Sequence, residues 1–158
     1  MRELILLRHA HAEQATPGQA DIDRPLSTEG IAEAEAAAAW LKANNLVPDR
    51  VLCSPSRRTR ETMEAVLGKV GYVDQRLDDA IYEATSGTLA GLADTHREAE
   101  RLLLVGHNPG LEQLAALMHS GQSGDHRGMP PGGIAVLTLP VDASIEPGIA
   151  QLSAFWWP

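Results

Sequence analysis

The strongest constraint on the fold is an uninterrupted apolar run near the start of the chain, Leu4–Leu7, which stops abruptly at Arg8 and His9. A run of this kind is typical of a strand that is buried on both faces, as in a parallel sheet covered by helices. Open α/β sheets bind their ligands at the carboxyl ends of such strands. Arg8 and His9 are therefore candidate ligand-binding residues, although a strand that simply reaches water also ends in polar side chains.

A second apolar run, Leu102–Val105, has the same character and is followed by Gly106 and His107. If the two predicted strands are neighbours in a parallel sheet, their carboxyl ends lie at one edge of that sheet. His9 and His107 then meet at this edge, where an imidazole can act as a nucleophile, a base or a metal ligand.

A third polar group lies between a predicted strand at 49–53 and the helix that follows it. Ser54 is the expected N-cap of this helix, Pro55 suits its first turn, and Gly68 is expected to end it. Cationic side chains near a helix N-terminus oppose the helix macrodipole. We therefore expect at least one of three arginines to have a further role: Arg57, Arg58 and Arg60.

The rest of the chain alternates between strand and helix patterns. Ser27 is the expected N-cap of an alanine-rich helix over 28–44, and further helices are predicted at 88–96 and 111–119. Strands are predicted at 73–77, 134–139 and 149–157, with loops at 14–24 and 120–133. This alternation predicts one domain over residues 1–158, an α/β fold built as a three-layer α/β/α sandwich with a mostly parallel central sheet.

The composition narrows the kind of partner. The chain has 158 residues, of which 44% are hydrophobic, and a net charge of -8 at neutral pH. This acidity argues against nucleic acids and anionic membranes as partners. We recognise neither a signal peptide nor a membrane-spanning stretch, and expect a monomeric cytoplasmic protein. An acidic protein that binds a phosphate must hold it with a local cluster of cations.

Three short motifs follow one another along the chain: Leu-Leu-Arg-His, Ser-Pro-x-x-Arg-x-x-x-Thr and Val-Gly-His-Asn-Pro. Their order and spacing resemble the histidine phosphatase superfamily, which is phosphoglycerate mutase-like in fold, and within it the short SixA-type phosphohistidine phosphatase branch. A fourth family pattern is matched by Arg24-Pro25-Leu26 together with Gly30. The resemblance covers nearly the whole chain and implies the phosphoglycerate mutase-like α/β/α sandwich.

The resemblance also implies roles for individual residues. His9 matches the nucleophile of the family, and the phosphate partners are Arg8, Arg58 and His107. Arg58, and not the arginine before it, matches because it stands three residues after Pro55. A departure follows the nucleophile, where many members have glycine. The alanine found here restricts the backbone and is expected to narrow the pocket without removing a chemical function.

The residue types suit phosphoryl transfer. A neutral imidazole attacks phosphorus and forms a phosphohistidine, which water then hydrolyses, while arginines stabilise the charge on the phosphoryl oxygens. Neither a metal nor another cofactor is required. The expected substrate is phosphohistidine on a protein. The alternatives are a phosphomonoesterase that acts on a small phosphorylated metabolite and a non-catalytic phosphate-recognition module.

Two further side chains leave alternatives open. Glu83 is positioned roughly where acid-bearing members of the superfamily keep the acid that protonates the leaving group, and is otherwise a solvated loop carboxylate. His11 either lines the rim of the pocket or lies on the loop surface. His9, His11 and His107 could instead bind zinc, but arginines rarely stand among metal ligands.

Overall fold

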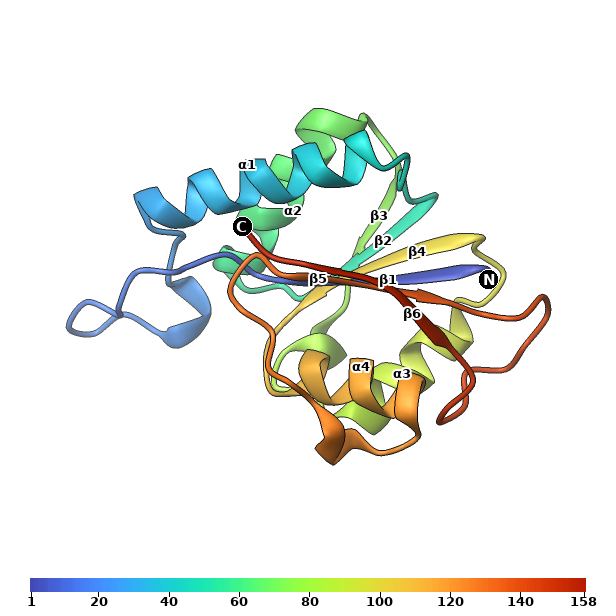
Figure 1. The fold of residues 1–158 in the computed structure, drawn as a ribbon. Helices are drawn as coiled ribbons and strands as arrows, with labels where there is room; N and C mark the ends of the chain where they lie inside the picture. The colour runs from blue at the N-terminus through green and yellow to red at the C-terminus, as the bar shows by residue number, and fades with distance from the viewer.

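One six-stranded sheet, in the order β3-β2-β4-β1-β5-β6, runs through the computed structural model, which describes residues 1–158 (Figure 1). Strands β1 to β4 are parallel to one another, and β5 is antiparallel to both of its neighbours. The predicted mostly parallel sheet is therefore confirmed. The strands are β1 (Glu3–Arg8), β2 (Arg50–Cys53), β3 (Asp74–Leu77), β4 (Arg101–Gly106), β5 (Ile134–Thr138) and β6 (Gln151–Trp156).

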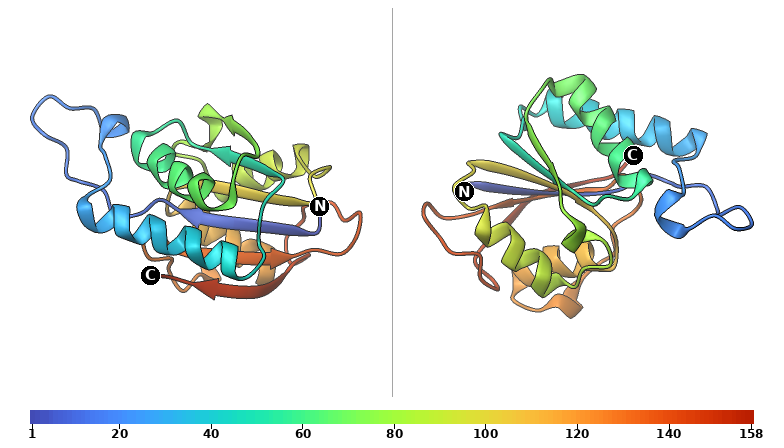
Figure 2. Two further views of the ribbon diagram at one scale, coloured as in Figure 1. Left: turned by 90° about the horizontal axis from the view of Figure 1, so that it is seen from above. Right: turned by 180° about the vertical axis from the view of Figure 1, so that it is seen from behind.

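Two pairs of helices cover the two faces of this sheet (Figures 1 and 2). One face carries α1 (Thr28–Ala43) and α2 (Arg57–Val70), and the other carries α3 (Ser86–Thr95) and α4 (Gly110–Ser120). Short 3-10 helices occupy Asp21–Asp23, Asp79–Ile81 and Ser123–Asp125. This is the expected three-layer α/β/α sandwich. None of the helices combines the length and apolar character that a membrane crossing requires.

The apolar run that opens the chain is buried on both sides. Leu4 and Leu6 belong to the core that includes residues of α3 and α4, whereas Ile5 and Leu7 belong to the core that includes residues of α1 and α2. All four side chains are fully buried. Because successive strand residues point to opposite faces, only a strand covered by helices on both sides needs four apolar residues in succession.

The register of the sheet brings the polar strand ends together. Arg8 lies opposite Gly106 where β1 pairs with β4, and Cys53 lies opposite Val105 where β2 pairs with β4. The backbone N–H of His9 also donates a hydrogen bond to the carbonyl oxygen of Gly106, over 3.0 Å. The segments that follow β1, β2 and β4 therefore leave the sheet at the same edge.

The start of α2 corrects one expectation. Ser56, not Ser54, is the N-cap, because its Oγ accepts a hydrogen bond from the backbone N–H of Thr59. Pro55 consequently lies before the helix and not in its first turn. The hydroxyl of Ser54 is free for another contact, which it makes with His107.

The end of α2 corrects another expectation. The helix continues through Gly68 to Val70 and is capped by Gly71, which has a φ of 91°. A glycine inside a helix costs only about 1 kcal/mol, whereas the positive φ at the cap favours glycine strongly. All other predicted element boundaries lie within two residues of the observed ones.

Gly30 is required by a close approach between α1 and the loop after β1. Ser27 caps α1 as predicted, with its Oγ accepting a hydrogen bond from the backbone N–H of Gly30. A Cβ on Gly30 would stand 1.9 Å from the carbonyl oxygen of His11, which is a severe overlap. The glycine of the Arg-Pro-Leu-x-x-x-Gly pattern therefore lets α1 pack directly on the segment that follows His9.

Candidate active site

His9 lies immediately after β1, and one of its ring nitrogens makes a hydrogen bond to the backbone. Its Nδ1 lies 2.7 Å from the carbonyl oxygen of Ala10. Because a carbonyl can only accept, Nδ1 must carry the proton that is donated. In the neutral ring the lone pair is then on Nε2, which is the state that a nucleophile needs.

The surroundings of His9 favour this neutral form. Burial is the main cause that lowers the pKa of His9 to about 3. The hydrogen bond to Ala10 opposes this shift, while the positive charges of Arg58 and Arg8 add to it. His9 is therefore uncharged near pH 7, with a nitrogen lone pair in a site lined by cations.

His107 follows β4 and lies next to His9, with a distance of 5.3 Å between the ring centroids. Arg58 donates to its Nδ1 over a long 3.4 Å, so that the neutral ring carries its proton on Nε2 and donates to Ser54 Oγ over 2.8 Å. Burial and the charge of Arg58 lower the pKa of His107 to about 4. Both histidines are thus neutral at physiological pH.

Arg58 is the buried cation of the site, only 7% exposed, although it lies in the first turn of α2. Its Nη1 donates to the carbonyl oxygen of Asp21 over 2.8 Å, and its Nη2 donates to the carboxylate of the same residue over 3.0 Å. The ring of Tyr82 lies 6.0 Å from the guanidinium carbon. These contacts hold the cation beside His107 against the unfavourable helix macrodipole.

Arg8, the last residue of β1, has an unused donor. Its Nη1 donates to the carbonyl oxygen of Met129 over 2.8 Å, while its buried Nε has no hydrogen-bond partner in the structure. Burial lowers the pKa of Arg8, which reflects this incomplete solvation. A buried N–H without a partner costs about 1–3 kcal/mol. An oxyanion bound beside His9 is the kind of acceptor that suits this donor.

The four residues that the resemblance implies therefore come together from three strand ends: Arg8, His9, Arg58 and His107. Glu83 does not join them through any hydrogen bond or ion pair that the structure contains. It is exposed on the loop before α3, with a φ of 58°. Its neighbour Tyr82 does face the site, with its ring edge-on to His107. The role of Glu83 stays a prediction.

His11 is directed elsewhere. Its Nδ1 lies 2.7 Å from the Oγ of Ser27, so that the exposed ring contacts the start of α1. No group of three histidine, cysteine, aspartate or glutamate side chains is arranged to hold a metal ion. The zinc alternative therefore finds no support in the position of His11.

Two expectations about neighbouring residues can also be compared with the structure. The methyl group of Ala10 is fully buried in a small cluster with Leu26 and Ala34, and the expected narrowing of the pocket stays a prediction. Arg57 is half-exposed and lies 3.7 Å from Glu61, away from the histidines. Arg58, which has the motif spacing after Pro55, contacts His107, whereas Arg57 does not.

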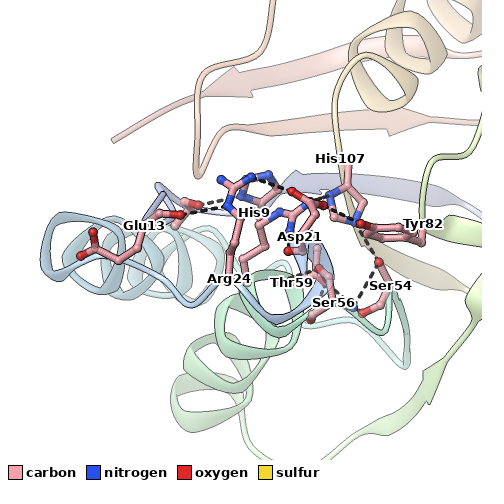
Figure 3. Close-up of polar contacts among 11 residues, drawn as sticks. His9, Glu13, Asp21, Arg24, Ser54, Ser56, Thr59, Tyr82 and His107 are labelled. Atoms are coloured by element: carbon pink, nitrogen blue, oxygen red, sulfur yellow. Dashed lines mark hydrogen bonds and ion pairs between the residues drawn. The ribbon is translucent and has the colours of Figure 1, made fainter. Parts of the chain in front are cut away.

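Sequence reasoning missed Asp21 and Tyr82 as members of the site (Figure 3). Asp21 lies in the 3-10 helix of the loop after β1 and accepts hydrogen bonds from Arg58, Arg24 and Tyr82. The only signal was the position of Asp21 three residues before Arg24 in the Arg-Pro-Leu pattern. Nothing in the spacing indicated that this loop folds back over α2.

The fold and the site define a class of protein. A mostly parallel sheet that is covered by helices on both faces is the architecture of the phosphoglycerate mutase-like fold. Residues 4–126 match the model of the histidine phosphatase superfamily (branch 1). The chain belongs to this superfamily and is a phosphatase.

Individual relatives point to one branch. The phosphohistidine phosphatase SixA of Escherichia coli is 38% identical over 127 residues, a stretch that covers 77% of this chain and 76% of that protein. A crystal structure from Agrobacterium tumefaciens, described as a SixA phosphohistidine phosphatase, superposes with a TM-score of 0.85 at 33% identity. That comparison covers 99% of this chain and 98% of the other. The chain is therefore similar to SixA-type proteins over nearly its full length.

Proposed function

We propose that the protein removes phosphoryl groups from phosphohistidine on other proteins, through a covalent phosphohistidine on His9. The observation that carries the proposal is the neutral Nε2 of His9 in a site where Arg8 has a buried donor without a partner. A nucleophile and a cation thus lie together where a phosphoryl group would need both. The similarity to SixA of Escherichia coli, named a phosphohistidine phosphatase, supports the choice of substrate.

In this mechanism Nε2 of His9 attacks phosphorus, and the bond between phosphorus and the leaving nitrogen breaks. Arg8 and Arg58 stabilise the charge on the phosphoryl oxygens. Water then attacks the phosphohistidine, which releases phosphate and restores the neutral imidazole. A dianionic phosphate raises the pKa of His107, so that a protonated Nδ1 donates to a phosphoryl oxygen in place of its long contact with Arg58.

The ionised state of Asp21, whose carboxylate contacts Arg58, supports the hypothesis that the substrate has a leaving group that needs no acid. Hydrogen bonds from Tyr82, Arg24 and Arg58 hold the pKa of Asp21 far below its usual range, so that this side chain is ionised and has no proton to give. An alkoxide leaving group requires an acid, whereas an imidazole leaves readily. The site therefore favours phosphohistidine over alkyl phosphates.

Two cavities of the structure lie apart from the histidines and arginines of the proposed site. One cavity, of about 790 Å³, is lined by residues of α4, β6 and the loop between α4 and β5. It includes neither of the catalytic histidines nor the arginines beside them, and the same is true of the second cavity. Neither of these two cavities is therefore part of the proposed phosphate site.

A substrate panel tests the proposal. We expect the highest kcat/KM for a histidine-phosphorylated protein, compared with the same protein phosphorylated on serine and with small phosphate esters. A higher value for a small metabolite would favour the phosphomonoesterase. Phosphate binding without turnover of any substrate would favour the recognition module.

Chelation should leave the activity unchanged, because in this reading arginines and not a metal stabilise the phosphoryl charge. We expect the same rate of phosphohistidine hydrolysis before and after dialysis against EDTA. A loss of activity that zinc restores would contradict this prediction and favour a metal site.

Glu83→Gln distinguishes an acid from a surface carboxylate. If Glu83 protonates the leaving group, the variant should hydrolyse alkyl phosphates about a hundredfold more slowly, at the lower end of the usual contribution of a general acid. Phosphohistidine and activated aryl esters should be affected little, because their leaving groups need no acid. The measurement is kcat/KM for both types of substrate. Equal losses would assign Glu83 a positioning role, and no loss would make it a solvated loop residue.

A further inference from the structure

The carboxylate of Asp21 contacts Arg58, the proposed phosphate-binding arginine, and also Tyr82 and Arg24. One carboxylate oxygen, Oδ2, accepts hydrogen bonds from Arg58 and from the hydroxyl of Tyr82. The other, Oδ1, accepts from Arg24 over 2.8 Å. The side chain is nevertheless 51% exposed, so this negative charge is accessible to solvent, and Figure 3 shows it near Tyr82 and His107.

The arginines around Asp21 are already engaged by carboxylates or by a backbone oxygen. A phosphate dianion is balanced by Arg8 and Arg58, and Arg24 is paired with Asp21. Arg57 is paired with Glu61.

The other charged side chains near Asp21 also provide no free cation. Arg60, in the second turn of α2, donates to the carbonyl oxygen of Pro55 over 3.0 Å, and Arg127 lines the separate cavity beside α4. The exposed carboxylate that contacts the phosphate-binding arginine is that of Asp21. An added negative charge next to the bound phosphate would therefore meet this carboxylate.

We propose that Asp21 is a specificity-determining residue that disfavours substrates carrying a second anionic group beside the phosphate, while it holds Arg58 in place for the phosphate itself. The inference rests on the proposed function in assuming that the phosphate binds between His9 and Arg58. Two like charges several ångströms apart at a protein surface weaken binding by about tenfold. The favoured substrates are those whose phosphoryl group is attached to a neutral or cationic carrier, of which imidazole is one.

The test compares two ligands that differ in one charge. Phenylphosphonate and 3-carboxyphenylphosphonate have the same ring and the same anionic head, and neither can be hydrolysed. We expect the wild-type protein to bind the carboxylated compound about tenfold more weakly by calorimetry. In Asp21→Asn, which keeps an amide oxygen to accept from Arg58, this ratio should fall close to one. Asp23→Asn, which removes the same charge two residues away, should keep the wild-type ratio.

The ratio of the two affinities separates the charge of Asp21 from its structural role. If the substitution displaced Arg58, both phosphonates would bind more weakly and the ratio would not change. An unchanged ratio in Asp21→Asn would overturn the proposal. Turnover of phenyl phosphate and 3-carboxyphenyl phosphate should show the same pattern. If the phosphonate ratio responds to Asp21 but a histidine-phosphorylated protein is not hydrolysed, the inference stands and the proposed phosphatase mechanism fails.

Discussion

His9→Ala should lower kcat/KM for phosphohistidine by roughly a thousandfold or more, which is typical of the loss of a covalent nucleophile. The variant should still fold, because His9 stands beyond the end of β1 and its side chain makes one hydrogen bond, to the carbonyl oxygen of Ala10. Losing that bond costs about 1 kcal/mol of the free energy of unfolding. Steady-state kinetics and a thermal unfolding curve measure the two effects separately.

The identity of the nucleophile can be established by trapping the intermediate. Wild-type protein quenched during turnover should contain a phosphoryl group that is labile in acid and stable in base, as expected for phosphohistidine. The matched control is His11→Ala, whose exposed imidazole contacts Ser27 and should be dispensable for trapping. A phosphoenzyme of the same stability in His9→Ala would falsify the assignment of the nucleophile.

The fold could be predicted because its central strands are apolar on both faces and must be covered by helices on both sides. Two apolar runs, Leu4–Leu7 and Leu102–Val105, are buried on both faces, so each requires helices above and below the sheet. The errors concern α2, where Ser54 and Ser56 are both competent caps and the local sequence does not choose between them. The contact of Ser54 with His107 is the long-range interaction that distinguishes them in the structure.

The site could be predicted only where its residues follow strands. Arg8, His9 and His107 lie at ends whose meeting point follows from the parallel register. Asp21 reaches the site from a loop whose path depends on the packing of Gly30 against the segment after His9. Such a path is not encoded in local spacing, so the position of Asp21 near the Arg-Pro-Leu pattern was too weak a signal to place it in the site.

The second large effect is expected for Arg58→Ala, which should lower kcat/KM by about a thousandfold, as does the loss of an arginine that stabilises a phosphoryl group in transit. Arg57→Ala is the matched control and should change kcat/KM less than about twofold, because exposed ion pairs contribute little. Arg58 is 8% exposed at its side chain and adjoins His107, whereas Arg57 is 50% exposed and only 3.7 Å from Glu61.

Two further measurements separate catalysis from folding in Arg58→Ala. The variant leaves Asp21 with hydrogen bonds from Arg24 and Tyr82, so the loop after β1 keeps two of its three ties to that carboxylate. Added guanidinium should restore part of the activity, because it can occupy the space of the missing side chain and supply the same planar donors. Arg58→Lys should remain impaired, since a single ammonium cannot reproduce the forked hydrogen bonds to Asp21 and the phosphate. Equal losses in Arg57→Ala and Arg58→Ala, with no rescue, would place the phosphate on a different part of α2.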